Sequence, residues 1–488
     1  MLFSELTAEQ TILLHQGNLA VPVRGIAYDS RKVEPGYVFV AIEGFQTDGH
    51  YFVEQAIAKG AIALVVQKPV AVPASVTWIQ VPQTRLALAL LSARFYNYPS
   101  RRLKLIGVTG TNGKTTTTYL LKDIFHNAGR RVGLVGTIAN WIGKQRLPVQ
   151  HTTPESLELQ KLFAEMVTSG VDTVVIEVSS HALALYRVVE CFFNTGVFTN
   201  LTQDHLDFHQ DMNDYLAVKK VLFERAGEFA VINHDDPAAP ELKKVSQAKI
   251  ITYGIRQAAD LMARDVKVSP KGASFQAVTP WGDTPVNLKL TGYFNVYNAL
   301  AALAVGGAHG LPLAVMVKAL EEVAGVPGRF ELIDRGQDFM VVVDYAHTPD
   351  GLENILKTAR QITPGRLITV FGCGGDRDRS KRALMGEIAA RYSELPVITS
   401  DNPRTEDPLQ IIADIEEGVR KVRRPGDYVV LPDRRKAIAY AINTGSRGDA
   451  VVVAGKGHED YQLIGAEKLP FDDRSEAVKA LEKRKLKI

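Results

Sequence analysis

A glycine- and threonine-rich segment at residues 107–116 constrains the fold of this chain more than any other feature. It follows an apolar run at 103–108 that is typical of a buried strand, and apolar residues with helical spacing come after it. A strand, a glycine-rich turn and a helix form the setting of a phosphate-binding loop, where backbone N–H groups and the helix N-terminus hold phosphate oxygens. The segment therefore predicts that Lys114 binds phosphate and Thr115 binds Mg²⁺, although the strict motif has glycine where this chain has Val108. A chance glycine-rich turn is the alternative.

Length and composition describe a globular protein with more than one domain. A chain of 488 residues is too long for one ordinary domain, and 46% hydrophobic with 23% charged residues is the balance of a folded chain. The net charge of +3 gives no general surface for nucleic acid or membranes, so neither is an expected partner. Glycines and a proline interrupt the weakly charged run at 299–317, so we expect two buried helices there and no membrane span.

Cysteine usage and the first residues bear on the compartment. Cys191 and Cys373 are too few and too far apart in sequence for a disulfide framework or a zinc site. The first residues lack the basic segment and apolar core of a secretory signal. We therefore expect a cytoplasmic protein.

Three blocks of alternating strands and helices divide the chain. Turn- and charge-rich segments separate them, which predicts an N-terminal domain at 1–98, a central domain at 99–331 and a C-terminal domain at 332–488. The expected fold class is α/β, with a small N-terminal α/β domain, a central phosphate-loop domain on a parallel sheet, and a C-terminal Rossmann-like, doubly wound domain. A period-two pattern at 260–286 predicts an antiparallel excursion. The expected strands are 25–28, 37–41 and 61–66, then 103–108, 131–137, 173–178, 196–199 and 229–233, then 339–343, 367–371, 397–399, 428–431 and 451–454.

Polar side chains gather directly after these expected strands. Because open α/β sheets bind ligands at the carboxyl ends of their strands, such clusters are candidate sites. In the central block, carboxylates and imidazoles at 177–181 and 200–207 indicate nucleotide and Mg²⁺ handling. Capping and turn formation are the alternative roles. In the C-terminal block, charged loops at 344–349, 372–379, 401–404 and 455–459 indicate a site for a small, highly charged ligand.

Together these motifs resemble those of the Mur ligase family, the ATP-dependent amide-forming enzymes of bacterial cell-wall synthesis. The resemblance covers essentially the whole chain. Within the family, the sequences Tyr-Asp-Ser-Arg at 28–31 and Asp-Gly-His at 48–50 are similar to the uridine-nucleotide domain of members that add the third residue of the stem peptide. The other segments that carry the resemblance are 109–116, 177–181, 200–205, 295–299, 327–331 and 344–347.

The resemblance implies a mechanism and a set of roles. The D-glutamate carboxylate of UDP-N-acetylmuramoyl-L-alanyl-D-glutamate would attack the γ-phosphate of ATP, and an amine would then attack the acyl phosphate. Because the ligands would touch all three domains, we expect the C-terminal domain to close onto the central one during turnover. We also expect a monomer. The implied catalytic residues are Lys114, Glu177, His205 and Lys219. The implied Mg²⁺ ligands are Thr115, Glu177, His205 and Lys219 as a carbamate. The implied ATP contacts are Gly110, Thr111, Asn112, Gly113, Lys114, Thr115, Thr116, Asn295, Arg329, Asp344 and His347.

The resemblance also implies the residues that touch the two other substrates. Carbamylation of Lys219 would convert its cationic side chain into an anion. The alternative interpretation of Lys219 is an ordinary solvated lysine, although neighbouring Lys220 is the better candidate for that role. The implied UDP-muramoyl-dipeptide contacts are Ser30, Asp48, Gly49, His50, Thr152, Thr153, Ser179 and Arg187; the implied diaminopimelate contacts are Arg377, Asp401, Asn402, Pro403, Arg404, Gly455 and Glu459.

The sequence Asp-Asn-Pro-Arg at 401–404 bears on the amine substrate. By resemblance, this form marks family members that use meso-2,6-diaminopimelate, whereas members that use lysine carry another residue in place of the arginine. A guanidinium can hold the extra carboxylate of diaminopimelate through two parallel hydrogen bonds, and it repels the lysine ammonium. We therefore expect diaminopimelate; L-lysine as substrate and an arginine in a surface turn are the alternatives.

Three other functions are alternatives. A folylpolyglutamate synthase shares the ATP domain but lacks a uridine-binding N-terminal domain, so the block at 1–98 argues against it. Loss of Lys114, Glu177 or His205 would have favoured a non-catalytic nucleotide-binding regulator, and all three are present. A mechanical NTPase needs an acidic pair at a strand end and an arginine finger, and we identify no such pair.

Overall fold

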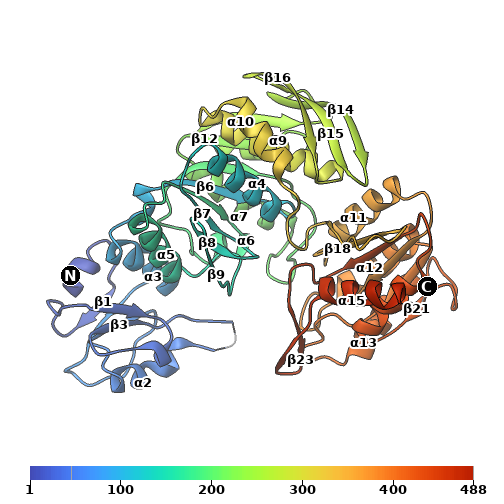
Figure 1. Cartoon of the computed structure of the whole chain (residues 1–488). Coiled ribbons are helices and arrows are strands. Elements are labelled where there is room, and N and C mark those ends of the chain that lie inside the picture. The colour runs from blue at the N-terminus through green and yellow to red at the C-terminus, as the bar shows by residue number, and fades with distance from the viewer. Residues whose placement is uncertain (46, 487–488) are drawn as a thin grey trace.

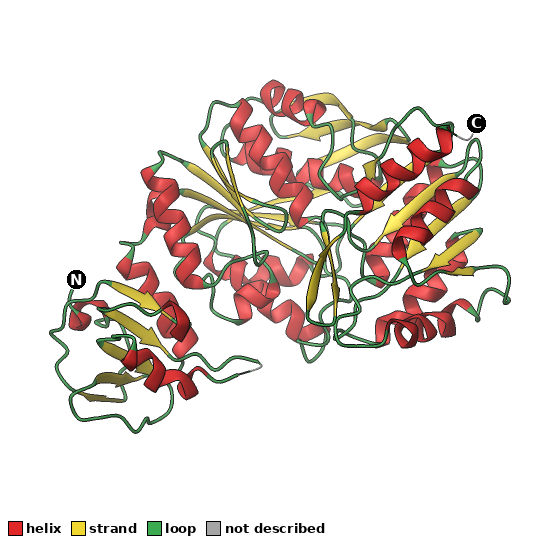
Figure 2. Cartoon of the chain, turned by 60° about the horizontal axis from the view of Figure 1, so that its bottom comes forward, coloured by secondary structure: helices red, strands yellow, loops and turns green. Residues whose placement is uncertain are grey.

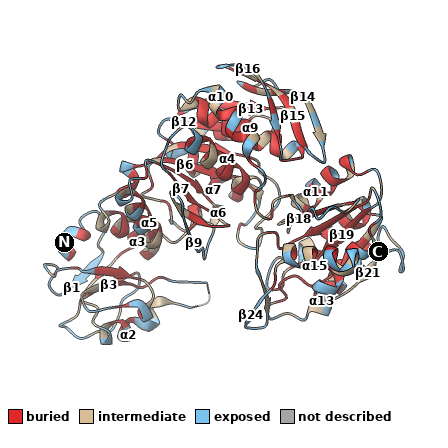
Figure 3. Ribbon diagram, viewed as in Figure 1, coloured by how far each residue is buried: buried red, intermediate tan, exposed pale blue. Residues whose placement is uncertain are grey.

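The structure, a computed structural model, describes residues 1–45 and 47–486. Three bodies follow one another along the chain, each built on its own main sheet (Figure 1). The parallel strands are buried on both faces because helices cover both sides, as the burial colouring shows (Figure 3). Among the described residues, no helix is long and apolar enough to cross a membrane.

The N-terminal body is a five-stranded sheet with a small apolar core on each face. Its edge strand at 14–16 is antiparallel, short and largely exposed, which is why no apolar pattern marks it in the sequence. In spatial order the strands are β1 (Leu14–Gln16), β5 (Thr77–Gln80), β4 (Ala63–Val66), β3 (Tyr37–Val40) and β2 (Gly25–Ala27), and the helices are α1 (Phe3–Leu6), η1 (Ser30–Lys32), η2 (Gly49–Phe52), α2 (Val53–Ala58) and α3 (Thr84–Phe95).

The central body is an eleven-stranded sheet in which seven consecutive strands, from β14 to β7 in spatial order, are parallel. The expected antiparallel excursion forms one end of this sheet, as two successive hairpins. In spatial order the strands are β16 (Gly282–Leu288), β15 (Gly272–Thr279), β14 (Leu261–Ser269), β13 (Lys249–Gly254), β12 (Phe229–Asn233), β11 (Phe193–Phe198), β6 (Lys104–Thr109), β10 (Thr173–Glu177), β7 (Val132–Val135), β8 (Asn140–Ile142) and β9 (Gln145–Leu147).

Helices pack on both faces of the central sheet, each against its own apolar core. One core joins the sheet to the helix that follows the phosphate loop and to the two buried helices expected around residues 299–317. This confirms the prediction of a parallel sheet covered on both sides, and Figure 2 shows the arrangement. The helices are η3 (Pro99–Arg102), α4 (Lys114–Asn127), α5 (Ser156–Thr168), α6 (Ser180–Ala184), α7 (Met212–Arg225), α8 (Ala239–Val245), α9 (Tyr293–Ala308) and α10 (Leu313–Glu322).

The C-terminal body is a six-stranded, mostly parallel sheet with an apolar core on each face, and a separate two-stranded hairpin follows it. In spatial order the strands are β17 (Glu331–Leu332), β18 (Met340–Asp344), β22 (Ala450–Ala454), β19 (Leu367–Phe371), β20 (Leu395–Ile398) and β21 (Val429–Val430); the hairpin is β23 (Tyr461–Ile464) and β24 (Glu467–Pro470); the helices are α11 (Pro349–Ile362), α12 (Ser380–Tyr392), α13 (Pro408–Val419), α14 (Arg434–Thr444) and α15 (Asp473–Lys485).

Each expected strand overlaps an observed one, and the errors are of two kinds. Boundaries shift by one to three residues; β11, for example, begins at Phe193 instead of residue 196. The strands β1, β5, β8, β9 and β17 and the hairpin β23–β24 were not expected, because they are brief or solvent-exposed and lack a continuous apolar run. The buried strand β13 was also not expected.

Candidate active site

The glycine-rich segment forms a tight turn between β6 and α4. Gly110 and Gly113 adopt positive φ angles of 147° and 87°, and a Cβ at Gly110 would overlap the Thr199 hydroxyl. Lys114 begins α4 and donates from Nζ to the carbonyl oxygens of Gly110 and Thr111, each at 2.8 Å. Burial lowers the pKa of Lys114 below its ordinary value. The turn thus has the compact shape and the lysine position that a phosphate-binding loop needs.

A buried carboxylate lies beside the start of α4. Because β10 pairs with β6, Glu177 at the end of β10 reaches the loop, and its Oε2 accepts a hydrogen bond from Thr115 Oγ1 at 2.9 Å. Thr137 donates to the same carboxylate from its amide at 2.8 Å and its hydroxyl at 3.0 Å. Arg329 donates to Thr115 Oγ1 at 3.0 Å, so a residue from beyond α10 completes the cluster.

The loop after β11 closes the other side of the phosphate-binding turn. The backbone oxygen of Asn200 accepts a hydrogen bond from the Thr111 amide, and its side-chain Oδ1 accepts one from the Asn112 amide, both at 2.9 Å. His205 has a positive φ of 56°, and its ring lies 3.3 Å from the Asp204 carboxylate. Burial lowers the pKa of His205 to about 4 against the opposing effect of Asp204, so this imidazole is neutral at pH 7 and able to bind a metal.

Lys219 lies in the middle of α7 and is buried, whereas its neighbour Lys220 forms an ion pair with Glu241 at 3.0 Å. The Lys219 ammonium lies 4.3 Å from the centroid of the Tyr215 ring, and within the described residues no carboxylate forms an ion pair with it. Burial, with Lys114 nearby, holds the pKa of Lys219 well below its ordinary value. Lys219 is therefore not the solvated lysine of the alternative interpretation.

The implied Mg²⁺ ligands match the metal in part. The Thr115 hydroxyl and the Glu177 carboxylate are hard oxygen donors in direct contact, which suits Mg²⁺. Across residues 1–45 and 47–486, no three His, Cys, Asp or Glu side chains form a ready-made metal cage.

The implied nucleotide contacts come from both sides of the boundary between the second and third bodies. Asn295 on α9 is buried and accepts from Asn298, which in turn accepts from Thr117 on α4. Asp344 ends β18, accepts from the amides of Phe330 and Ala346, and has its pKa raised by burial. His347 contacts the Tyr345 carbonyl at 2.8 Å through Nδ1, and burial lowers its pKa to about 4. Thr116 is buried in the first turn of α4.

A carboxylate of the C-terminal body lies directly on the phosphate-binding loop. Asp350, in the first turn of α11, accepts hydrogen bonds from Asn112 Nδ2 at 2.7 Å and Thr202 Oγ1 at 3.0 Å. The sequence did not indicate this contact, because an acidic residue in the first turn of a helix is ordinary capping chemistry. Likewise nothing in the sequence marked Thr137 as a partner of Glu177.

The implied UDP-muramoyl-dipeptide residues fall into two groups in different bodies. Asp48, Gly49 and His50 form one closed turn: His50 contacts Asp48 at 2.5 Å through Nδ1, and its Nε2 accepts from the amide of Gln67 at 2.9 Å. Gly49 lies against the Ile42 backbone, where a Cβ would meet the Ile42 nitrogen at 2.7 Å. Both ring nitrogens of His50 thus have protein partners, so its side chain shapes this turn. Ser30 is buried and its hydroxyl donates to Gln55 at 2.7 Å.

The second group lies at the central strand ends. Thr153 donates to the Glu177 carbonyl at 2.7 Å and to Ser179 at 3.4 Å, and Thr152 accepts from Thr137 at 3.1 Å. Arg187 donates to the Thr153 carbonyl at 3.1 Å and pairs with Glu155 at 2.8 Å. These residues are therefore tied to Glu177.

The implied diaminopimelate residues meet at one edge of the C-terminal sheet, where β18, β22, β19 and β20 are neighbours. Asp401 and Asn402 are buried, and Asn402 donates to Glu459 at 3.0 Å. A Cβ at Gly455, whose φ is 121°, would meet Asp401 Oδ2 at 2.5 Å. The Pro403 carbonyl accepts from the Glu406 amide, and Arg377 binds the Asp376 carbonyl at 2.9 Å.

Arg404 adopts a left-handed conformation with φ of 53°. The hairpin holds it there: its amide donates to the Leu463 carbonyl at 3.1 Å, and its carbonyl accepts from the Gly465 amide at 2.7 Å. The guanidinium donates from Nη1 to the Gly375 carbonyl at 2.7 Å. Within the described part of the chain, no hydrogen bond engages Nε or Nη2, so these two parallel donors are available to a carboxylate.

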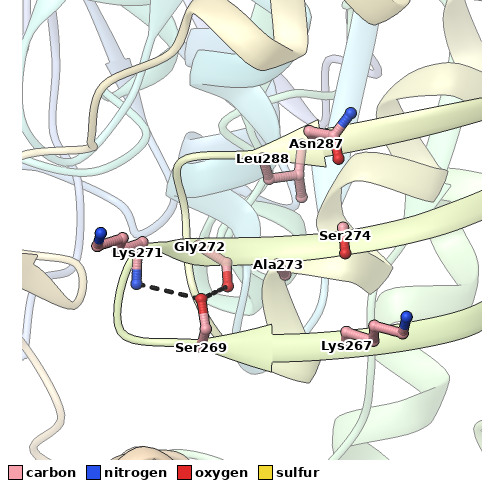
Figure 4. A pocket seen from close by; sticks show the side chains of 8 residues that line it. All are labelled: Lys267, Ser269, Lys271, Gly272, Ala273, Ser274, Asn287 and Leu288. Atoms are coloured by element: carbon pink, nitrogen blue, oxygen red, sulfur yellow. Dashed lines mark hydrogen bonds between the residues drawn. The ribbon is translucent and has the colours of Figure 1, made fainter.

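A small cavity of about 180 Å³ lies elsewhere, between the hairpin strands β14, β15 and β16. Figure 4 shows its lining, in which the Ser269 hydroxyl joins the Lys271 amide and the Gly272 carbonyl. None of the predicted site residues contributes to this cavity.

Comparison with known proteins agrees with this architecture. Three family models match: "Mur ligase family, catalytic domain" at 22–96, "Mur ligase middle domain" at 108–306, and "Mur ligase, glutamate ligase domain" at 328–457. The chain belongs to the Mur ligase family and is, like its members, an ATP-dependent ligase.

Individual relatives give a narrower indication. A protein of Alkaliphilus metalliredigens is 52% identical over 94% of this chain and 93% of its own length, and one of Geobacillus thermodenitrificans is 50% identical over 94% of both. Both are named UDP-N-acetylmuramoyl-L-alanyl-D-glutamate--2,6-diaminopimelate ligase. A solved structure with the same name is 35% identical, covers 99% of each chain and has a TM-score of 0.69.

Proposed function

We propose that this chain joins meso-2,6-diaminopimelate to UDP-N-acetylmuramoyl-L-alanyl-D-glutamate at the expense of ATP, a step of peptidoglycan precursor synthesis. The names of relatives about 50% identical over nearly the whole chain support the reaction. The structural observation that supports the choice of amine is that Nε and Nη2 of Arg404 are free to bind a carboxylate. Close by in the chain, Asn402 donates a hydrogen bond to the Glu459 carboxylate. The arginine suits a carboxylate and the glutamate an ammonium, and diaminopimelate carries both groups at its distal end.

The chain's residues support the first chemical step as follows. An oxygen of the D-glutamate side-chain carboxylate attacks the γ-phosphorus of ATP, the bond to the β,γ-bridging oxygen breaks, and ADP leaves. Lys114, Arg329 and the N-terminus of α4 place positive charge around the phosphates. Thr115, Glu177 and His205 are the residues that would hold Mg²⁺, which when bound neutralises phosphate charge.

The second step joins the amine. The neutral amine of diaminopimelate attacks the acyl carbon, a proton leaves the nitrogen, and the C–O bond to phosphate breaks to release inorganic phosphate. Asp401, Asn402, Arg404 and Glu459 would orient the distal end of the amine substrate, so that its reactive nitrogen faces the acyl phosphate. Exclusion of water protects the anhydride, and we propose that closure of the C-terminal body provides it.

We propose that Lys219 is carbamylated. Its amine is buried, and burial holds its pKa well below its ordinary value, which favours the neutral amine that attacks CO₂. The N–C bond forms, one proton is lost from the nitrogen, and the resulting carbamate anion would be attracted to the nearby Lys114 ammonium.

The remaining parts of the proposal concern organisation. We propose domain boundaries at residues 98 and 331, the implied contacts to the UDP-muramoyl dipeptide, and a monomer acting in the cytoplasm. Ligation of L-lysine is the second candidate, and the position of Arg404 disfavours it. A non-catalytic regulator on the same fold is disfavoured because Lys114, Glu177 and His205 are all retained in one cluster of strand ends.

Mass spectrometry tests the reaction. With ATP, Mg²⁺ and diaminopimelate, the UDP-muramoyl dipeptide should gain the mass of diaminopimelate less one water. Glu177→Gln should abolish the gain while Glu241→Gln, on the surface helix α8, leaves it. A mass unchanged with every amine would contradict the proposal.

A further inference from the structure

A fully buried lysine lies at the centre of the proposed amine-binding pocket. Lys456 follows Gly455 at the end of β22, and its side chain has no exposed surface. A buried ammonium is costly unless it is paired, so its partners identify what it does. None of the functions described above uses it.

Lys456 joins two of the residues proposed to bind diaminopimelate. Its Nζ donates to Asn402 Oδ1 at 2.9 Å and to Glu459 Oε2 at 3.0 Å, and it lies 3.9 Å from Asp401 Oδ1. The Tyr461 ring centroid is 5.4 Å from the same nitrogen. The lysine therefore bridges the loop after β20 to the loop after β22.

These contacts fix the orientation of both partners. Asn402 Oδ1 accepts from Lys456 and from the Leu463 amide at 3.0 Å, which leaves its Nδ2 to donate to Glu459 Oε2. Glu459 Oε2 thus receives two donors, and within the described residues no hydrogen bond engages Oε1. The carboxylate is held so that one oxygen stays available to an ammonium.

The charges of the cluster lead to the same conclusion. Asp401 and Glu459 carry two negative charges and Lys456 one positive charge. The neighbouring Arg434 is already neutralised by Asp473, to which it donates twice at 2.7 Å. Arg404, whose guanidinium interacts with Asp401 and Glu459, supplies a second positive charge. The cluster is therefore balanced, as suits the distal end of an amino acid that brings both an ammonium for Glu459 and a carboxylate for Arg404.

We propose that Lys456 is a positioning residue for the amine substrate: it holds Asn402 and Glu459 in the arrangement that receives the ammonium at the distal end of diaminopimelate. This inference rests on the proposed function. It predicts a role in the second step only, because the acyl phosphate forms without the amine.

The two steps can be measured separately. Hydroxylamine traps an acyl phosphate as a hydroxamate without any diaminopimelate, and the KM for diaminopimelate reports the second step. We would compare the full-length wild type with Lys456→Met and with the control Lys468→Met. Lys468 is exposed on β24, and its ammonium lies 4.0 Å from the centroid of the same Tyr461 ring.

Lys456→Met should raise the KM for diaminopimelate at least 30-fold while hydroxamate formation stays within twofold of wild type. Lys468→Met should change neither. A KM within threefold of wild type in Lys456→Met would overturn the inference, and so would parallel loss of both activities in a folded variant. If circular dichroism shows that the methionine variant is unfolded, Lys456→Gln decides by the same criteria. A wild type that forms neither hydroxamate nor amide would instead contradict the proposed function.

Discussion

Replacement of Arg404 tests the basis of amine selection. The side chain is half-buried, and burial lowers the pKa of its guanidinium below its ordinary value. One nitrogen is used by the Gly375 carbonyl, which leaves Nε and Nη2 for the substrate carboxylate. Two charge-assisted hydrogen bonds are worth about 1.5–3 kcal/mol each, and partial exposure reduces the sum to about 2–5 kcal/mol. Arg404→Ala should therefore raise the KM for diaminopimelate by a factor of about 30 to several thousand.

Steady-state phosphate release with diaminopimelate and with L-lysine measures this effect. Arg420→Ala is the matched control, because Arg420 is an exposed arginine on the same body that contacts Glu416 and Tyr428. We expect Arg404→Ala to lose preference for diaminopimelate and to keep its KM for ATP. An unchanged KM for diaminopimelate would refute the assignment of Arg404 to its carboxylate.

Three further predictions concern other parts of the molecule. Lys219→Arg should abolish activity, since a guanidinium forms no stable carbamate, whereas Lys220→Arg should not; equal activities, measured by phosphate release, would count against carbamylation. Asp350→Ala removes the hydrogen bonds to Asn112 and Thr202, and should weaken docking of the C-terminal body on the central body by about 1–3 kcal/mol. Small-angle scattering should therefore show a larger radius of gyration for Asp350→Ala than for the wild type or for the control Glu353→Ala on the same helix. Equal radii of the Asp350→Ala variant and the wild type would contradict a stabilising contact. The pKa values of His181, His205 and His347 are lowered to about 4 by burial, so the unfolded chain binds more protons between pH 6.5 and 4. The urea midpoint should therefore fall as the pH is lowered through that range, and a flat profile would refute the buried, neutral state of these imidazoles.

The sequence predicted the strand ends well because local patterns determine them. The run before residue 109, the glycines at 110 and 113 and the carboxylate at 177 each follow from apolar periodicity and turn chemistry. Parallel pairing then brings these ends together, so the contact between Thr115 and Glu177 follows from the fold class. The pairing of β6 with β10 thus turns two local predictions into one site.

Contacts between the bodies could not be predicted in this way. Asn112 and Asp350 are 238 positions apart, and no local pattern on α11 distinguishes a capping carboxylate from one that contacts the phosphate-binding loop. The burial of Lys456 could not be predicted for a different reason. A lysine between two glycines is typical of a solvated turn, whereas Lys456 is surrounded by two carboxylates and a side-chain amide. The sequence likewise did not show that both ring nitrogens of His50 contact protein groups, Asp48 and the amide of Gln67.

A competition experiment tests the central claim most directly. Purified protein would receive ATP, Mg²⁺, UDP-N-acetylmuramoyl-L-alanyl-D-glutamate and equal concentrations of meso-2,6-diaminopimelate and L-lysine, and the two tripeptide products would be separated by mass. We expect the diaminopimelate product in large excess, with one ADP formed per amide bond. A lysine product in excess, or ADP formed without either amide, would contradict the account.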